Sequence, residues 1–310
     1  MHNYKLQITS GYLPNKSLII IDGTSYLYRA YYALPMLINS QGEPTGAIYG
    51  ICKMFSSLLK QYKPSHMVVV FDVRGKNFRN YLFPAYKLNR QPMPEPLSVQ
   101  IKPIYGILRA MGIYTMAAVS GFEADDIIGT LSQQLSKQGY MVLISSIDKD
   151  IAQLVTSNIL ILNKMKILGP QEIQDKYGVP PSLIIDLIAL IGDSCDNIPG
   201  VPGIGVKIAQ KLLLEIGNLN KILSHINKIK NMSFRSAKLI AANLEKHKYL
   251  TMIYRKLATI KTDIELKVSY DELAIKAPDI DKLVFLFKHY ELKQLIPKSK
   301  ISILKCYKNN

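Results

Sequence analysis

The sequence predicts an α/β protein, in which a mainly parallel sheet flanked by helices is followed by an all-helical region. Apolar runs typical of buried strands alternate with stretches of helical periodicity, and this alternation is the pattern of a parallel sheet. The expected strands lie near residues 18–22, 67–72, 113–117, 141–145 and 159–162. The expected helices between them lie near residues 25–33, 46–62, 97–111 and 123–137. From about Pro181 onward, one helical stretch follows another.

The order of these elements divides the chain into three parts. We expect residues 1–16 to form a loosely ordered extension before the first strand. Residues 17–180 carry the alternating strands and helices, and residues 181–310 carry the helical region. With 310 residues, 48% of them hydrophobic, the chain can bury one large core or two smaller ones.

Residues 74–96 interrupt the alternation of strands and helices. A connection of this length is usually functional or disordered. Its basic and aromatic residues interleave, a pattern that suits a strand of nucleic acid with phosphates on the cations and bases on the rings. A mobile, solvated loop is the alternative interpretation. The residues concerned are Lys76, Phe78, Arg79, Tyr81, Phe83, Tyr86, Lys87 and Arg90.

Nine carboxylates stand out in a chain whose formal charge is +16. The apolar run LIIID ends at Asp22, and MVVVFD ends at Asp72. Because the carboxyl ends of strands in an open α/β sheet share one edge, such side chains should gather there. Gathered carboxylates raise one another's pKa unless cations compensate them, so the sequence predicts a site for several metal ions. The nine are Asp22, Asp72, Glu123, Asp125, Asp126, Asp148, Asp150, Asp193 and Asp196.

The spacing inside this set supports a shared site. Two pairs are three residues apart at a helix end, and a third pair is two residues apart, which puts both side chains on one side of an extended segment. Ordinary helix capping also explains acidic residues at a helix start, so the first pair alone decides nothing. The pairs are Glu123 and Asp126, Asp193 and Asp196, and Asp148 and Asp150.

The charge balance predicts a nucleic-acid partner. The chain has 39 Lys and Arg residues against 23 Asp and Glu residues, and nine of the acidic residues belong to the predicted site. The remaining surface is therefore basic, as in proteins that bind nucleic acids. Solubilising lysines that reflect a biased composition are the alternative. A phosphodiester held on a basic surface, with Mg²⁺ or Mn²⁺ on the carboxylates, is the arrangement of two-metal phosphoryl transfer.

The segment DNIPGVPGIGVKIAQKLL predicts a second nucleic-acid contact. Gly200, Gly203 and Gly205 surround a turn that opens into a helix near Val206, and Lys207 lies in its first turn. Free amides at a helix start and a nearby lysine can hold a phosphate. We interpret residues 182–216 as a helix-hairpin-helix that binds duplex backbone without reading bases. A Gly- and Pro-rich turn between packed helices is the alternative.

Other features exclude several classes of protein. The three cysteines show no CxxC pair, so neither a disulfide framework nor a structural zinc site is indicated, and a reducing cytoplasm fits. No apolar run is long enough to span a membrane, and the first residues do not resemble a secretory signal. The five histidines form no spaced cluster, which argues against covalent catalysis.

Several stretches together resemble the 5′-nuclease domain of bacterial DNA polymerase I, over residues from about 17 to nearly the C-terminus. The resemblance implies a PIN-like 5′-nuclease fold with a helical arch at about 74–96 and a C-terminal helix-three-turn-helix region. It implies a 5′→3′ exonuclease and flap endonuclease that removes primers in replication and acts in repair. The stretches are DGTSYLYRAYYALP, GEPTGAIYG, VVVFD, FRNYLFPAYKLNR, SGFEADDIIGTL, DKDIAQLV, YGVPPSLIIDLIALIGDSCDNIPGVPGIGVKIAQKLL, SFRSAKL and LATIKTD.

The same resemblance assigns ligands and site residues. It implies two or more Mg²⁺ or Mn²⁺ ions on the nine carboxylates, and a K⁺ ion at the helix-hairpin-helix. The partner would be flapped, nicked or branched duplex DNA, bound by a cytoplasmic, nucleoid-associated monomer. Gly200, Gly203, Gly205 and Lys207 would contact this DNA. The residues on the family's functional basic and aromatic positions are Arg29, Arg79, Tyr86, Lys87 and Arg90.

The chain departs from the family at a few places. Ile147 stands where the family has glycine before the DKD motif, and Cys195 replaces a small polar residue. The chain stops at Asn310, which we interpret as a stand-alone nuclease, working beside a separate polymerase, or an excised domain. An inactive DNA-binding module, an exonuclease-like paralogue and a PIN-like RNase are the alternatives. The complete carboxylate set disfavours the first two, and the hairpin disfavours the third.

Overall fold

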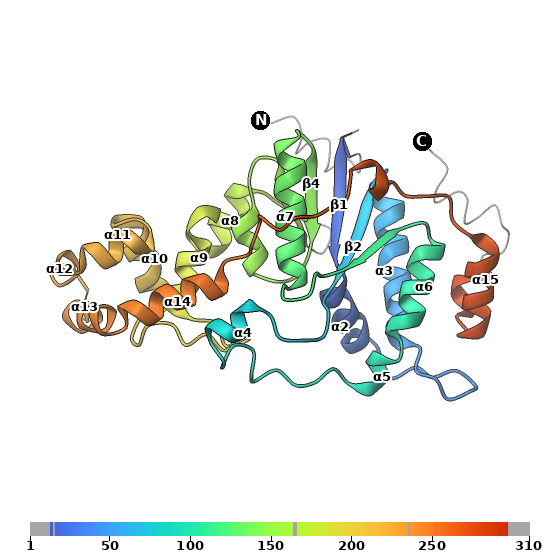
Figure 1. The fold of residues 1–310 in the computed structure, drawn as a ribbon, viewed down its shortest axis with the longest axis horizontal. Helices are drawn as coiled ribbons and strands as arrows, with labels where there is room; N and C mark the ends of the chain where they lie inside the picture. The colour runs from blue at the N-terminus through green and yellow to red at the C-terminus, as the bar shows by residue number, and fades with distance from the viewer. Residues whose placement is uncertain (1–12, 15, 164–165, 235, 297–310) are drawn as a thin grey trace.

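The parallel sheet lies in the interior of an elongated molecule with helices on both sides of it, and on one side further helices extend to the end of the molecule (Figure 1). The computed structural model describes residues 13–14, 16–163, 166–234 and 236–296. Within these residues the sheet has six strands in the order β3-β2-β1-β4-β5-β6, parallel except for the β5–β6 pair. The strands are β1 (Ser17–Asp22), β2 (Met67–Phe71), β3 (Tyr114–Ala117), β4 (Met141–Ser145), β5 (Ile159–Asn163) and β6 (Lys166–Leu168). The predicted α/β fold is thus confirmed. Of the six strands, only the short β6 was not expected from the sequence.

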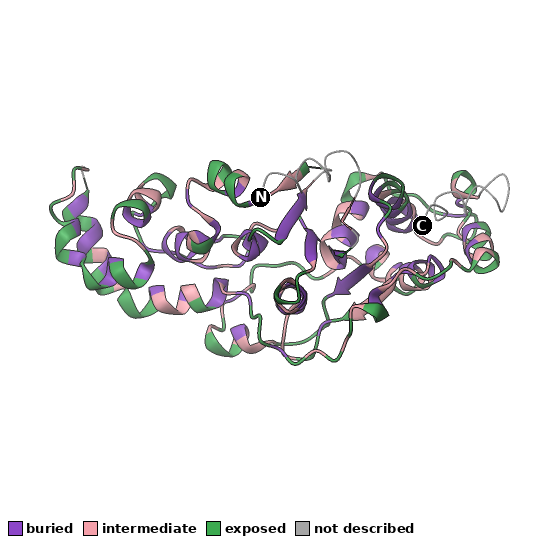
Figure 2. Ribbon diagram, turned by 90° about the horizontal axis from the view of Figure 1, so that it is seen from above, coloured by how far each residue is buried: buried purple, intermediate pink, exposed green. Residues whose placement is uncertain are grey.

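Both faces of the sheet are buried because its central strands are apolar throughout. In β1, Leu18 and Ile20 belong to one hydrophobic cluster, whereas Ile19 and Ile21 belong to the other, on the opposite face. Figure 2 shows the buried strands between helices whose outer turns are exposed. The continuous apolar runs of the sequence thus place the sheet at the centre of the α/β half.

Helices from distant parts of the chain cover these two faces. One cluster contains residues of α2 (Gly23–Ala33), α3 (Gly46–Tyr62), α6 (Ile101–Ala110) and α15 (Ile280–His289). On the other face α7 (Ala124–Lys137) packs on the strands through Ile127, Ile128 and Leu131. The segment expected to form an arch contains the short helices α4 (Phe78–Leu82) and α5 (Glu95–Ser98), joined by turns.

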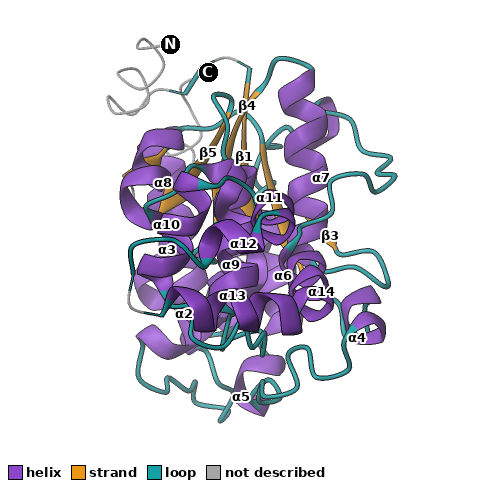
Figure 3. Cartoon of the chain, turned by 90° about the vertical axis from the view of Figure 1, so that its left-hand side faces the viewer, coloured by secondary structure: helices purple, strands orange, loops and turns teal. Residues whose placement is uncertain are grey.

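The hydrophobic cluster on the α7 face of the sheet extends into the helical half. In Figure 3 the helices of this half lie in front of the sheet. Buried residues of the helical half such as Leu190, Leu212 and Ile240 join those of β1 and β4 in it. The two halves therefore share one core. The helices of the second half are α8 (Pro170–Tyr177), α9 (Ile184–Ile191), α10 (Val206–Glu215), α11 (Leu219–Ser224), α12 (Ile226–Ile229), α13 (Ala237–Lys246) and α14 (Lys248–Ala258). Single 3₁₀ turns are η1 (Asp150–Leu154), η2 (Pro181–Leu183), η3 (Asp271–Leu273) and η4 (Lys293–Leu295).

The succession of helices expected from Pro181 stops at Ala258, because the chain then returns to the α/β half. Residues 259–279 are largely irregular, and Ile275 N donates to Ser65 O (2.9 Å) while Lys276 N donates to Gly112 O (2.9 Å). A side chain at Gly112 would collide with the Lys276 carbonyl, since an ideal Cβ there lies 2.0 Å from that oxygen. The return segment has no periodicity, which explains why the sequence pattern did not reveal it.

The expected extension, residues 1–16, lies outside the described residues except at positions 13, 14 and 16. Among the helices that the structure describes, none combines the length and the apolar character needed to cross a bilayer.

Candidate metal centre and nucleic-acid interface

The predicted strand-end carboxylates lie at one edge of the sheet, because β1 is paired with β2 on one side and β4 on the other. Asp22 ends β1, is buried, and accepts hydrogen bonds from Ser25 N (3.0 Å) and the Ser146 hydroxyl (2.8 Å). Asp72 follows β2 and accepts a hydrogen bond from Ala124 N (2.8 Å) at the start of α7. The sheet topology thus brings the β1 and β2 carboxylates to the N-terminus of α7.

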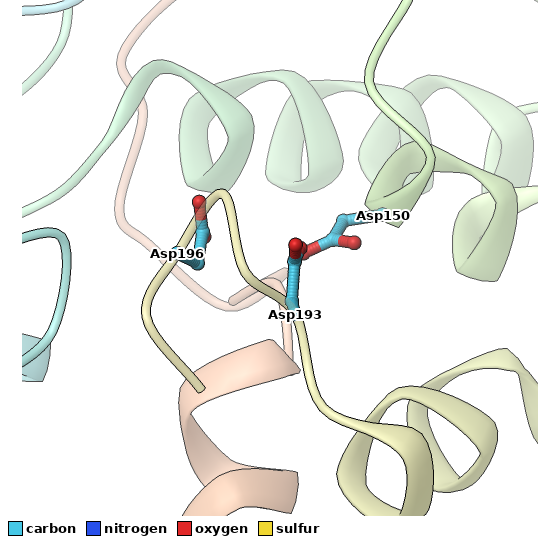
Figure 4. Close-up of side chains that lie close together, drawn as sticks. All are labelled: Asp150, Asp193 and Asp196. Atoms are coloured by element: carbon cyan, nitrogen blue, oxygen red, sulfur yellow. The ribbon is translucent and has the colours of Figure 1, made fainter. Parts of the chain in front are cut away.

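A second group of carboxylates lies where the loop after β4 meets the loop after α9 (Figure 4). Ligand oxygens of Asp150, Asp193 and Asp196 lie within 4.8 Å of one another, and all three residues are buried. Among the described residues, Asp150 Oδ1 has no hydrogen-bond partner although it is fully buried. A buried carboxylate oxygen without a donor costs free energy unless a cation satisfies it. These three residues therefore fit a divalent cation.

The two groups of carboxylates interact electrostatically. Burial, followed by the charges of Asp148, Asp196 and Asp193, raises the pKa of Asp150 well above its ordinary value. Burial, then the charges of Asp148 and Asp22, has the same effect on the pKa of Asp125. A bound divalent cation would reverse these shifts by favouring the ionised form.

The pKa values of the other members follow the same logic. Burial is the largest cause of the raised pKa of Asp22, and it outweighs the hydrogen bonds from Ser25 and Ser146. Burial is also the main reason that the pKa of Asp148 is raised. At Asp196, in contrast, the charges of Lys87 and Arg90 outweigh burial and lower the pKa.

The arch segment binds directly to these carboxylates. The Tyr86 hydroxyl donates to Asp196 Oδ2 (2.9 Å), Lys87 Nζ to Glu123 Oε1 (2.7 Å), and an Arg90 guanidinium nitrogen to Asp196 Oδ1 (2.6 Å). The backbone is held too, since Lys87 N donates to Asp196 O (3.0 Å). Lys87 has a positive φ of 55°, a strained value for a residue with a side chain. These contacts bring three of the predicted arch residues into the carboxylate site.

A cavity of about 1120 Å³ lies beside the arch. Asp72 and Glu123 line it, so it opens onto the carboxylate site. Its lining combines cations with aromatic rings, the combination expected for a single strand of nucleic acid. The cations include Arg74, Lys76, Lys87 and Arg90, and the rings include Tyr28, Tyr81, Tyr105 and Phe122.

Arg29, Arg79 and Asp126 are among the predicted residues that do not line this cavity. Arg79 and Asp126 form a buried ion pair, with a nitrogen-to-oxygen distance of 2.7 Å. Arg29 lines a separate cavity of about 260 Å³ together with Lys53 and Ser57. Arg29 therefore lies apart from Lys87 and Arg90, whereas an Arg79 guanidinium nitrogen lies 3.5 Å from Glu123 Oε2, on the residue that also binds Lys87.

The predicted hairpin connects α9 and α10, and its residues differ in exposure. Gly203, Gly205 and Lys207 are exposed, and Gly205 precedes the first residue of α10. Gly200 is buried, and an ideal Cβ there would lie 2.4 Å from Gly192 N. Gly200 therefore allows two backbone segments to pack closely, whereas the other three residues are accessible to a ligand.

The structure adds residues to the site that sequence reasoning missed. Lys149 Nζ lies 2.9 Å from Asp193 Oδ1, and Asn77 Nδ2 donates to Glu123 Oε1 (2.9 Å). Asn77 also caps α4 by accepting from Arg79 N (2.9 Å). Two sequence features could have indicated these site residues. Lys149 lies between Asp148 and Asp150, and Asn77 lies at the start of a short helix. Of the two departures noted in the sequence, Ile147 and Cys195 are both exposed.

Comparisons with known proteins agree with this arrangement. Residues 17–178 match the family model of the 5′-3′ exonuclease, N-terminal resolvase-like domain, and residues 179–281 match that of the 5′-3′ exonuclease, C-terminal SAM fold. A 5′-3′ exonuclease of Buchnera aphidicola subsp. Schizaphis graminum is 43% identical over 286 residues, which are 91% of this chain and 99% of that protein. DNA polymerase I of Pseudomonas aeruginosa is 44% identical over 279 residues, 89% of this chain but 30% of the polymerase.

A solved structure has the same fold. The bacteriophage T5 D15 flap endonuclease, in a pseudo-enzyme–product complex with DNA and metal ions, matches with a TM-score of 0.64. The match covers 94% of this chain and 100% of that chain, at 22% sequence identity. At this identity the likeness concerns the fold.

Proposed function

The chain belongs to the 5′-3′ exonuclease family, and we propose that it is a structure-specific nuclease that hydrolyses DNA phosphodiesters at 5′ flaps and 5′ ends. Membership of the family makes it an enzyme that degrades a nucleic-acid strand from the 5′ end. One observation carries the finer proposal. Cations of the arch contact Glu123 and Asp196 of the carboxylate site, and Glu123 borders the cavity of about 1120 Å³ together with those cations.

The carboxylates would hold two or more Mg²⁺ or Mn²⁺ ions, which prefer hard oxygen ligands. Asp150, Asp193 and Asp196 form one group of ligands. The other group consists of Asp22, Asp72, Glu123, Asp125 and Asp148. Divalent ions held there would supply Lewis acidity and a source of hydroxide near neutral pH.

The arch residues have roles that follow from their contacts. Lys87 Nζ lies 2.7 Å from Glu123 and 3.7 Å from Asp196, so its charge lies where a scissile phosphate would approach the carboxylates. Arg90 is half-exposed and can contact the same phosphate. Burial, then the charges of Glu123 and Asp196, raises the pKa of Tyr86, so its hydroxyl stays protonated. This hydroxyl donates a hydrogen bond to Asp196 and thereby orients the carboxylate.

The two DNA contacts divide the substrate between them. A single-stranded 5′ end would occupy the cavity beside the arch, where Tyr81 and Arg74 are among the lining residues. The duplex would lie on Lys207 and the amides around Gly203 and Gly205, whose surroundings are open: no other atom lies within 4 Å of an ideal Cβ at Gly205. A K⁺ ion held at this hairpin belongs to the same proposal.

The wider role is also a proposal. The match to the N-terminal part of a DNA polymerase I supports action beside a separate polymerase in primer removal and repair. We propose that the nuclease acts there as a monomer, in the cytoplasm at the nucleoid.

One assay tests the proposed function. The pure protein is incubated with a labelled 5′-flap duplex, a blunt duplex, and single-stranded DNA and RNA, each with Mg²⁺, Mn²⁺, Ca²⁺ or EDTA. We expect cleavage at the flap junction with Mg²⁺ or Mn²⁺, little with Ca²⁺ and none with EDTA. Cleavage in EDTA, or preferential cleavage of single-stranded RNA, would overturn the proposal.

A further inference from the structure

The buried ion pair between Arg79 and Asp126 lies at the start of the arch, outside the cavity that faces the metal site. Arg79 is 2% exposed and Asp126 is fully buried. Two guanidinium nitrogens of Arg79 donate to the two oxygens of Asp126, at 2.8 and 2.7 Å. Bidentate pairing of this kind fixes both side chains in one geometry.

The hydrogen-bonding capacity of Asp126 is fully used inside the protein. Its Oδ2 also accepts from Glu123 N (3.0 Å), and its Oδ1 also accepts from Lys261 N (2.9 Å). A carboxylate has about four lone-pair sites, so these contacts leave no site for a metal ion. In this respect Asp126 differs from Asp150, which has a buried oxygen without a donor among the described residues.

Arg79 also contacts Glu123, whose Oε2 lies 3.5 Å from a guanidinium nitrogen, and its remaining donors reach the helical half. Its Nε donates to Leu257 O (2.9 Å) in the last turn of α14, and a terminal nitrogen donates to Thr259 O (2.8 Å). Burial alone would lower the pKa of Arg79, but the hydrogen bond of Asp126 and the charges of Glu123 and Asp126 outweigh it and raise the pKa, so the guanidinium stays protonated. The pair therefore connects the arch, the acidic N-terminus of α7, and the end of the helical half.

We propose that Arg79 and Asp126 are positioning residues that fix the distance between the bound duplex and the metal site, and thereby the nucleotide that is cleaved. This inference rests on the proposed function. The hairpin holds the duplex in the helical half, whereas the carboxylates lie in the α/β half. The number of nucleotides between the two contacts is constant only if the halves and the arch keep one arrangement. Arg79 would then act through the protein and not on a phosphate, and Asp126 would not be a metal ligand.

The chain contains a matched control pair. Arg255 Nε donates to Asp186 Oδ1 (2.5 Å), Asp186 is 1% exposed, and Asp186 Oδ2 also accepts from Leu219 N (3.0 Å). Asp186 is buried whereas Arg255 is 36% exposed, and these hydrogen bonds of the pair stay within the helical half. Arg255→Lys and Asp186→Asn therefore impose the same chemical changes as Arg79→Lys and Asp126→Asn without altering the junction.

The experiment compares these four variants with the parent protein. Cleavage products of a 5′-flap duplex are separated at single-nucleotide resolution under single-turnover conditions with Mg²⁺, and thermal unfolding reports on stability. We expect Arg79→Lys and Asp126→Asn to spread cleavage over neighbouring phosphates. Arg255→Lys and Asp186→Asn should cut at the parent position, even if they lower the unfolding midpoint by a similar amount. Parent-like cleavage positions in both junction variants would overturn the proposal.

A second measurement tests the assignment of Asp126 without catalysis. The number of bound Mn²⁺ ions is measured by titration calorimetry for the parent, Asp126→Asn and Asp150→Asn. Asp126→Asn should bind as many ions as the parent, whereas Asp150→Asn should lose one. Loss of an ion in Asp126→Asn would overturn the assignment. If the parent does not cleave flaps, the proposed function fails, while the ion count still decides whether Asp126 is a ligand.

Discussion

The carboxylate site and the arch meet at Glu123 and Asp196, but different forces build them. The strand-end carboxylates are placed by the order of parallel strands, which the backbone and a fully buried core enforce. The arch is placed by side-chain contacts to those carboxylates, such as Lys87 with Glu123 and Arg90 with Asp196. Backbone topology thus sets the positions of the carboxylates, whereas ion pairs hold the Lys and Arg side chains of the arch. The two regions should therefore respond differently to substitution and to pH.

We expect the largest loss of activity when a predicted metal ligand is removed from the carboxylate site. Asp150→Asn keeps the size of the side chain but removes the charge next to Asp193 and Asp196. Losing the transition-state stabilisation of one bound ion, several kcal/mol, should slow single-turnover cleavage more than about 10³-fold, with DNA affinity largely retained. Parent-like cleavage by this variant with Mg²⁺ would contradict the role of the Asp150, Asp193 and Asp196 group.

The next effect tests the arch. Lys87→Ala removes a cation from the carboxylate site and should reduce the single-turnover rate by about 10²–10³-fold. Duplex affinity should change much less, because the charge acts mainly in the transition state. Lys16 is exposed, so Lys16→Ala is the matched control and should cleave at the parent rate. Equal rates for both variants would show that the arch is not part of the reaction.

The hairpin should bind duplex DNA without taking part in the reaction. Lys207→Ala should weaken duplex binding to every sequence and reduce the slope of log K against log salt by about one unit. Fluorescence anisotropy over a range of KCl concentrations measures both quantities. The rate at saturating DNA should stay near that of the parent. A loss confined to some sequences would mean that the hairpin reads bases.

The smallest effect concerns stability and has the opposite sign to the effect on activity. The pKa of Asp150 is raised by folding, so its ionisation opposes folding. This penalty is absent below the ordinary pKa of aspartate and grows as the pH rises from there toward the raised pKa. In EDTA near neutral pH, Asp150→Asn should therefore unfold about 1.5 °C higher than the parent for each kcal/mol of penalty removed.

Two further measurements complete this stability test. The difference between Asp150→Asn and the parent should disappear at pH 3, where both folded and unfolded forms of the parent carry a protonated Asp150. It should reverse when Mg²⁺ is added, because the parent binds the ion more tightly. Calorimetric scans at the two pH values measure these changes. A lower midpoint for the variant in EDTA at neutral pH would show that Asp150 stabilises the metal-free fold.

Much of the fold and of the site could be predicted from the sequence for physical reasons. Apolar strand runs fix a parallel sheet, and a parallel sheet places the residues after β1, β2 and β4 at one edge, which explains why Asp22, Asp72 and Asp148 could be grouped from the sequence. Spacing could not reveal that Arg79 pairs with Asp126, because that pair depends on how α4 packs against α7 and on the end of α14. Gly200 and Gly203 look alike in sequence, and only packing makes one of them buried and the other exposed.

The return of the chain from α14 to the sheet has a consequence for biosynthesis. Leu283, Phe287 and Leu292 complete the same hydrophobic cluster as Ile19 and Ile21, so the core of the α/β half needs residues from near the end of the described chain. A ribosome-bound chain that has emerged only as far as α14 lacks these side chains. Contacts of such long sequence separation, as between Ser65 and Ile275, also slow folding. The α/β half therefore completes its core only after residues up to Leu292 have left the ribosome.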